Sequence, residues 1–157
     1  MGRRRNSFAS SAELCERLPA MAAFTHTLRV RYHECDTQGH VFNANYFAYF
    51  DVAITELWRG LLEGGYGTML EELGVDMVVG EATARFLGSA RFDDLIDIDV
   101  ELTRLGTTST TTAFTVRRGP ETLVEGELRH VYVDTQTMSK APIPDALRTA
   151  LAPYIRA

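Results

Sequence analysis

The sequence predicts an α+β fold in which an antiparallel sheet wraps around one long central helix. Residues 44–63 carry apolar side chains at helical spacing over so much of the circumference that burial on one side would not cover them. Other segments alternate apolar and polar residues, as strands with one buried face do. Along the chain, one such segment precedes the long helix and about four follow it.

The size and composition of the chain fit a single globular domain. Its 157 residues are 45% hydrophobic and 24% charged, which is ordinary for a protein with a full hydrophobic core. The net charge of -5 argues against nucleic-acid binding, which relies on attraction to phosphates. No apolar run approaches the ~20 residues that span a bilayer, and no apolar stretch follows Arg3–Arg5 as it would in a secretory signal. We therefore expect a cytoplasmic protein that binds neither nucleic acid nor membrane.

Neither a metal nor another cofactor is expected. Cys15 and Cys35 lack the spacing of a zinc site and are too few for a disulfide framework. The run from His33 to Asp36 cannot readily converge on one ion, because adjacent residues of an extended chain point to opposite faces.

Residues 1–22 differ in composition from the rest of the chain. They combine the basic cluster Arg3–Arg5 with several serines and a brief helical pattern that Pro19 closes. Met21 directly precedes the first strand-like segment and is an alternative start of translation. We expect residues 1–22 to be a poorly ordered extension and residues 23–157 to form the folded domain.

The predicted strand before the long helix covers residues 25–32. Leu28, Val30 and Tyr32 alternate with polar residues, which places them together on one face of this strand. From residue 33 to residue 41 the chain keeps no sustained period, so a loop is expected there.

The long helix at 44–63 has sequence signals at both ends. Asn43 is a suitable N-cap, and Gly64-Gly65 provides a stop. A second, short helix is expected at 68–73, where Gly74 ends the pattern.

Four strands and a final helix complete the predicted domain. The alternation is cleanest in the second of these strands, where the inward residues are Ile96, Ile98, Val100 and Leu102. A turn at 118–121 separates the last two strands. The predicted strands cover residues 76–87 with a potential break at Gly80, 95–104, 107–117 and 123–134, and the helix covers 145–154.

The candidate catalytic residue is Asp36, which lies in the loop just ahead of the long helix. The first turn of a helix presents unpaired N–H groups and the positive end of the helix dipole. Such an end can keep a carboxylate ionised and can stabilise the oxyanion of acyl transfer. Most loop aspartates, however, simply bond their own backbone, so the spacing alone leaves both roles open.

The residues around Asp36 resemble the signature of the 4-hydroxybenzoyl-CoA thioesterase family, whose members have the hotdog fold. The pattern Asp-x-x-Gly-His-Val-x-Asn-x-x-Tyr is formed here by Asp36, Gly39, His40, Val41, Asn43 and Tyr46. The likeness extends over about residues 25–140. Many relatives have a second asparagine where this chain has Phe42, a departure that leaves Asp36 untouched.

The resemblance implies hydrolysis of an acyl-CoA or acyl-carrier thioester. Asp36 matches the carboxylate that attacks the thioester carbonyl or activates a water molecule. Asn43 matches the residue whose backbone N–H polarises that carbonyl. Tyr46 lines the acyl site or packs in the core, and its place on the apolar stripe favours the core. The expected substrate-binding residues are Gly39, His40, Val41, Asn45, Tyr46 and, for the CoA phosphates, Arg104 in preference to Arg91, Arg117 and Arg118.

By the same resemblance, two protomers pair edge strands into one continuous sheet, and two such dimers form a homotetramer. Residues from a partner chain then complete each site. Two rival functions remain: a hotdog hydratase or dehydratase with Asp36 and His40 as acid and base, and a non-catalytic acyl-CoA-binding module.

Overall fold

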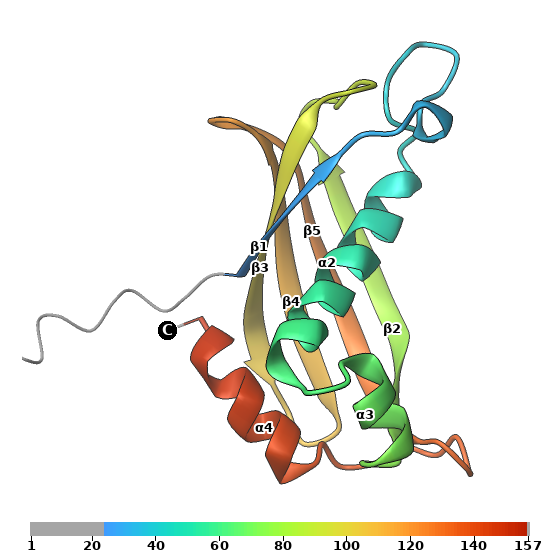
Figure 1. The fold of residues 1–157 in the computed structure, drawn as a ribbon, viewed down its shortest axis with the longest axis vertical. Helices are drawn as coiled ribbons and strands as arrows, with labels where there is room; N and C mark the ends of the chain where they lie inside the picture. Colours follow the sequence, from blue (N-terminus) through green and yellow to red (C-terminus); the bar gives the residue numbers. More distant parts are fainter. Residues whose placement is uncertain (1–23, 157) are drawn as a thin grey trace, which may run out of the picture.

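Five antiparallel strands form one sheet in the order β1-β3-β4-β5-β2 in the computed structural model, which describes residues 24–156. Helix α2 (Asn45–Leu61) lies along one face of this curved sheet (Figure 1). The strands are β1 (Phe24–Arg29), β2 (Val75–Phe86), β3 (Leu95–Leu105), β4 (Ser109–Arg118) and β5 (Glu121–Asp134). The predicted α+β hotdog arrangement is therefore confirmed, while the expectations for residues 1–22 lie outside the described residues.

The short helices divide between the two ends of the sheet. Helices α3 (Tyr66–Glu71) and α4 (Asp145–Leu151) lie at one end, and the 3-10 turn η1 (Tyr32–Glu34) lies at the other (Figure 1). A second 3-10 turn, η2 (Ala152–Tyr154), follows α4 directly. Within residues 24–156, no helix has both the length and the apolar character that crossing a bilayer requires.

The core lies between α2 and the inner face of the sheet. The inward residues predicted for β3 are 0–1% exposed. Phe50 of α2 stacks on Phe114 of β4, with ring centroids 4.5 Å apart. A Cβ at Gly126 of β5 would lie 2.4 Å from the Phe50 ring, so the absence of a side chain there lets the helix approach the sheet closely.

The first strand ends earlier than predicted. β1 stops at Arg29, and Tyr32 begins η1 with 81% of its surface exposed, so its predicted place in the strand is wrong. The backbone N–H of Arg31 donates to the Glu34 carboxylate at 2.8 Å, a local bond that turns the chain away from β3. The alternation of apolar and polar residues could not reveal that the Glu34 side chain competes with the sheet for the backbone N–H of Arg31.

The long helix also starts differently from the prediction. Asn43 is not the N-cap: Ala44 holds that position, and no side chain caps the helix there. Instead, the Asn45 side chain donates from Nδ2 to the carbonyl oxygen of Glu34 at 2.7 Å. The second helix is shifted as well, covering Tyr66–Glu71 rather than 68–73.

Strand β2 forms one edge of the sheet and carries the predicted irregularity. Its pairing with β5 shifts register between Val79 and Glu81, which places a bulge at Gly80. Because β2 has only one neighbouring strand, its outer backbone edge is unpaired within the described chain.

Candidate active site

Residues 36–40 form a tight hairpin at the η1 end of the molecule. The backbone N–H of Asp36 donates to His40 O at 2.8 Å, and Gly39 N–H donates to Asp36 O at 3.0 Å. Gly39 has a φ of +77°, which three-residue hairpin loops require at this position and glycine adopts without strain. Glycine at this position therefore makes the tight turn possible.

The two carboxylate oxygens of Asp36 differ in the hydrogen bonds that they accept. Oδ1 accepts the backbone N–H of Gln38 at 2.9 Å and that of His40 at 3.3 Å, as the turn role predicts. Oδ2 accepts no hydrogen bond from any residue in the described part of the chain. Asp36 therefore stabilises its own hairpin with one oxygen, while the other is left without a donor among the described residues.

Two backbone N–H groups at the start of α2 are also without acceptors. Phe42 N–H donates to Glu34 O at 2.9 Å, and Asn45 N–H donates to Phe42 O at 2.9 Å. Between them, the N–H groups of Asn43 and Ala44 bond to no residue in the range 24–156. They lie at the positive end of the α2 dipole, where a developing negative charge is stabilised.

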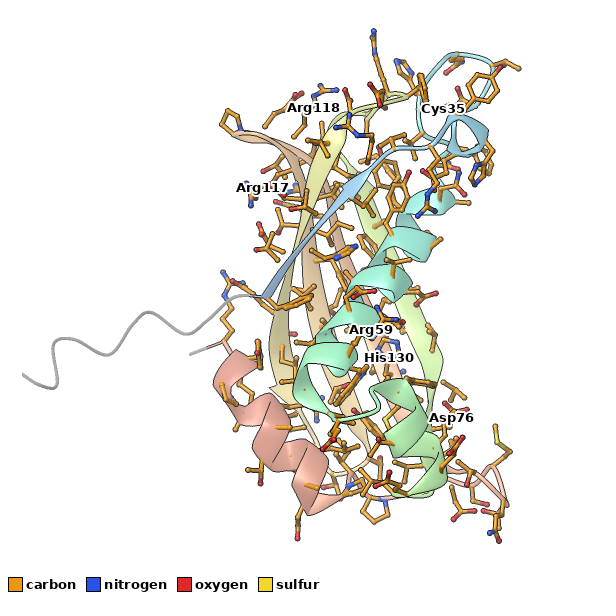
Figure 2. The ribbon with its side chains drawn as sticks, in the orientation of Figure 1. Cys35, Arg59, Asp76, Arg117, Arg118 and His130 are labelled. Atoms are coloured by element: carbon orange, nitrogen blue, oxygen red, sulfur yellow. The ribbon has the colours of Figure 1, made fainter. Side chains whose placement is uncertain are left out.

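A cavity of about 330 Å³ joins the hairpin to the helix start. Cys35, the residue before Asp36, lies at the same end of the fold as Arg118, and Asp76 lies at the other end (Figure 2). The residues that line the cavity are Asp36, Gln38, His40, Val41, Phe42, Asn43, Tyr46, Phe86 and Ser89. The fold thus brings together most of the residues predicted from the motif.

Tyr46 is buried in the core and also lines the cavity. It is 2% exposed, and its hydroxyl oxygen accepts the backbone N–H of Ala90 at 2.9 Å. Burial raises the pKa of Tyr46 above its ordinary value, so the phenol stays neutral. Its ring packs edge-on against Phe86, which connects α2 to the end of β2.

Three of the residues predicted to bind substrate do not line this cavity. Gly39 and Asn45 do not line the cavity; Gly39 shapes the hairpin, and Asn45 bonds to Glu34. Arg104 is exposed near the far end of β3, paired with Thr111, away from the cavity of its own chain. Its role in phosphate binding stays a prediction.

Glu34 organises the junction between the hairpin and the helix, and the sequence analysis missed it. Only 7% of Glu34 is exposed, and its carboxylate accepts the Tyr49 hydroxyl at 2.7 Å and the Arg31 guanidinium at 3.2 Å. Burial and the bond to Glu34 raise the pKa of Tyr49 far above its ordinary value. Nothing in the local pattern distinguishes a buried glutamate from a solvated one in this loop.

Phe86 and Ser89 were missed as well. Phe86 ends β2 and Ser89 follows it, both far along the chain from the motif, and they reach the cavity because Val41 N–H donates to Ala90 O at 2.9 Å. In the described residues, no group of three or more histidine, cysteine, aspartate or glutamate side chains is arranged to hold a metal ion.

Comparisons with known proteins show the family of this chain. A family model for the thioesterase-like superfamily matches residues 30–151. The chain is 30% identical over 125 residues to the acyl-CoA thioester hydrolase YbgC of Escherichia coli, an alignment that covers 79% of this chain and 92% of that protein.

Solved structures show the same fold. A thioesterase-superfamily protein from Jannaschia superposes with a TM-score of 0.81 at 23% identity, over 87% of this chain and 95% of that one. A hypothetical protein from Aquifex aeolicus superposes with a TM-score of 0.74 at 25% identity, over 82% and 98%. Because the family model spans most of the chain and the folds agree, this chain belongs to the thioesterase-like superfamily, as the residues around Asp36 predicted.

Proposed function

We propose that this protein hydrolyses acyl-CoA thioesters, with Asp36 as the catalytic carboxylate and the start of α2 as the oxyanion hole. One observation carries the proposal: the unbonded Oδ2 of Asp36 and the unpaired N–H of Asn43 belong to residues that line the same cavity. The similar Escherichia coli protein is named an acyl-CoA thioester hydrolase, which supports this choice of substrate class.

In the proposed reaction, the thioester carbonyl oxygen accepts the N–H groups of Asn43 and Ala44. These donors stabilise the negative charge that forms on this oxygen when the carbonyl carbon is attacked. Asp36 Oδ2 either attacks this carbon, expels the thiolate and forms an anhydride that water cleaves, or takes a proton from the attacking water. Both routes yield the free acid and CoA.

Replacing Asp36 by asparagine tests the catalytic role without removing the turn. The asparagine amide would keep an oxygen for the N–H groups of Gln38 and His40, so the hairpin should persist. We expect kcat for a panel of acyl-CoAs to fall by about 10²–10⁴-fold, the usual contribution of such a group. Near-normal thiol release by Asp36→Asn would refute the proposal.

The rival functions predict different products. A hydratase would use the neighbouring pair Asp36 and His40, and would change the absorbance of a crotonyl thioester without releasing thiol. A binding module would be stabilised by acyl-CoA and would release no thiol either. Running the absorbance and free-thiol assays side by side on the wild-type protein therefore separates all three.

We also propose that two protomers pair along β2, and that two such dimers associate as a tetramer. The inner face of this edge strand leaves apolar side chains uncovered: Val79 is 51% exposed and Phe86 is 47% exposed. Covering them would remove an unpaired sheet edge, which otherwise invites aggregation. Since Phe86 also lines the cavity, the partner would lie beside the active site and complete it.

A charge on the β2 edge tests this assembly. In light scattering, we expect the wild-type protein to have a molecular mass that is a multiple of 17.5 kDa and Ala82→Lys to have the mass of one chain. The variant should also lose its activity. The matched control is Thr27→Lys on the other edge strand, β1, where Asp97 can pair with the new charge. A multimer that survives Ala82→Lys but not Thr27→Lys would show that β1 is the paired edge.

A further inference from the structure

Asp36, His40 and Arg91 form one cross-strand row beside the cavity. The backbone of Asp36 bonds to that of His40 across the hairpin, and His40 pairs in antiparallel fashion with Arg91. Val41 N–H donates to Ala90 O, so His40 and Arg91 face each other as a pair without hydrogen bonds between them. Side chains opposite each other in such a pair lie on the same face and at their closest.

Arg91 brings a positive charge without a direct ion pair to this row. Its side chain is exposed, and its guanidinium forms no ion pair with any of the described residues. The other arginines at this end are paired: Arg29 with Asp93 at 3.1 Å, Arg31 with Glu34 at 3.2 Å, and Arg118 with Asp94 at 2.7 Å and Glu121 at 2.7 Å.

The carboxylate that bonds to the Arg91 backbone forms its ion pair with another arginine. Asp94 accepts the backbone N–H of Arg91 at 2.9 Å, but its charge is paired with the Arg118 guanidinium. Partial burial acts to raise the pKa of Asp94, but these hydrogen bonds and the positive charges of Arg118 and Arg91 together lower it, which keeps Asp94 ionised and in its ion pair with Arg118. In a chain with a net charge of -5, a free guanidinium next to the cavity is a distinctive feature.

The proposed substrate has an anion where such a group would meet it. Acyl-CoA and acyl-carrier thioesters share a phosphopantetheine arm, whose thiol end carries the acyl group and whose other end carries a phosphate. With the carbonyl at Asp36, an arm that runs along the row passes His40 and comes to Arg91. The planar guanidinium of arginine binds phosphate oxygens in pairs.

We infer that Arg91 binds the phosphate of the phosphopantetheine arm, and the inference rests on the proposed thioester hydrolysis. It assigns the phosphate contact to the residue that pairs with the cavity-lining His40, whereas Arg104 lies near the far end of β3. Since both thioester sources carry this phosphate, rates on acyl-CoA and on acyl-carrier protein with the wild-type protein distinguish the natural source.

The test combines two changes, removal of the Arg91 side chain from the protein and removal of the phosphate from the substrate. One acyl group is presented as the thioester of pantetheine, of 4′-phosphopantetheine and of CoA. We expect Arg91→Ala to lower kcat/KM by roughly 10- to 100-fold for both phosphorylated thioesters, as loss of a charged hydrogen-bonded contact does. The pantetheine thioester should react at the wild-type rate. Arg156→Ala, which removes another exposed arginine, should leave all three unchanged.

Binding of free products supplies a second measurement. In isothermal titration calorimetry, CoA should bind Arg91→Ala about 10- to 100-fold more weakly than wild type, while pantetheine binds both equally. An equal loss on all three thioesters, a loss confined to CoA, or a phosphate-dependent loss in Arg104→Ala instead would each overturn the inference. Failure of the wild-type protein to release thiol even from the pantetheine thioester would refute the proposed function itself, and the inference with it.

Discussion

The side-chain amide of Asn45 donates a 2.7 Å hydrogen bond to the carbonyl oxygen of Glu34. The same carbonyl accepts the N–H of Phe42 at 2.9 Å, so one oxygen holds the chain on both sides of Asn43 and Ala44. This arrangement fixes the direction of the two N–H groups assigned to the oxyanion. Glu34, two positions before Asp36, thus holds the two N–H groups that we propose as the oxyanion donors.

We predict that Asn45→Asp lowers kcat by about tenfold or more, because the new carboxylate could not donate to the Glu34 carbonyl. An acidic residue in the first helical turn is otherwise favourable, so the melting temperature should change little. Steady-state kinetics and thermal unfolding measure the two effects. Ala48→Glu adds the same charge to the same turn without removing a bond and should retain wild-type kcat. An unchanged kcat in Asn45→Asp would show that this bond does not position the donors.

We predict that Tyr49→Phe lowers the free energy of unfolding by about 1.5–3 kcal/mol, the usual value of a hydrogen bond to a charged group. The hydroxyl of Tyr49, a residue 3% exposed, donates to the Glu34 carboxylate at 2.7 Å. Urea unfolding measures the loss. Tyr154→Phe removes a hydroxyl that bonds to no described residue, so it should cost much less. Equal stability of the two variants would contradict this role for Tyr49.

We predict that alanine substitutions at two glycines have opposite effects on stability. Gly126→Ala places a methyl group 2.4 Å from the Phe50 ring and should destabilise the protein by about 1–3 kcal/mol through overpacking. Gly60→Ala, in the exposed last part of α2, meets no atom within 4 Å and should stabilise it by roughly 0.5–1 kcal/mol. Chemical denaturation of both variants checks the signs, and a stable Gly126→Ala would mean that α2 does not sit as closely on β5.

We predict that His130 makes the protein less stable as the pH falls below about 6.5, the ordinary pKa of histidine. His130 is 5% exposed on β5, and burial lowers its pKa. The unfolded chain therefore takes up a proton at a higher pH than the folded chain does. The stabilising contribution of neutral His130 is complete above pH 6.5 and is lost as the pH falls through the folded-state pKa.

His130→Gln isolates this contribution, because glutamine is polar and does not titrate in this range. Urea unfolding at pH 7.5 and at pH 5.5 should show a smaller loss for His130→Gln than for the wild-type protein, with a difference of up to about 1.4 kcal/mol. Parallel losses in the two proteins would assign the pH dependence to other groups.

Local patterns predicted the sheet and the central helix because the spacing of apolar residues in these elements decides which side chains are buried. The alternation on β3 placed Ile96, Ile98, Val100 and Leu102 inward, and all four are buried. The register shift at Gly80 was likewise expected from a glycine in a strand. Two of the wrong predictions, Tyr32 in the strand and Asn43 as N-cap, concern the end of β1 and the start of α2, which Glu34 organises.

The sequence by itself determined the fold class, the family and the position of Asp36 ahead of a buried helix, because these depend on periodicity and on a contiguous motif. Only the tertiary structure decided how the site is built. It left only one carboxylate oxygen of Asp36 with hydrogen bonds from the described residues. It also brought Phe86 and Ser89 to the cavity and set Arg91 opposite His40. Such contacts join segments far apart in the chain, and they form because packing and pairing of the whole domain place those segments together.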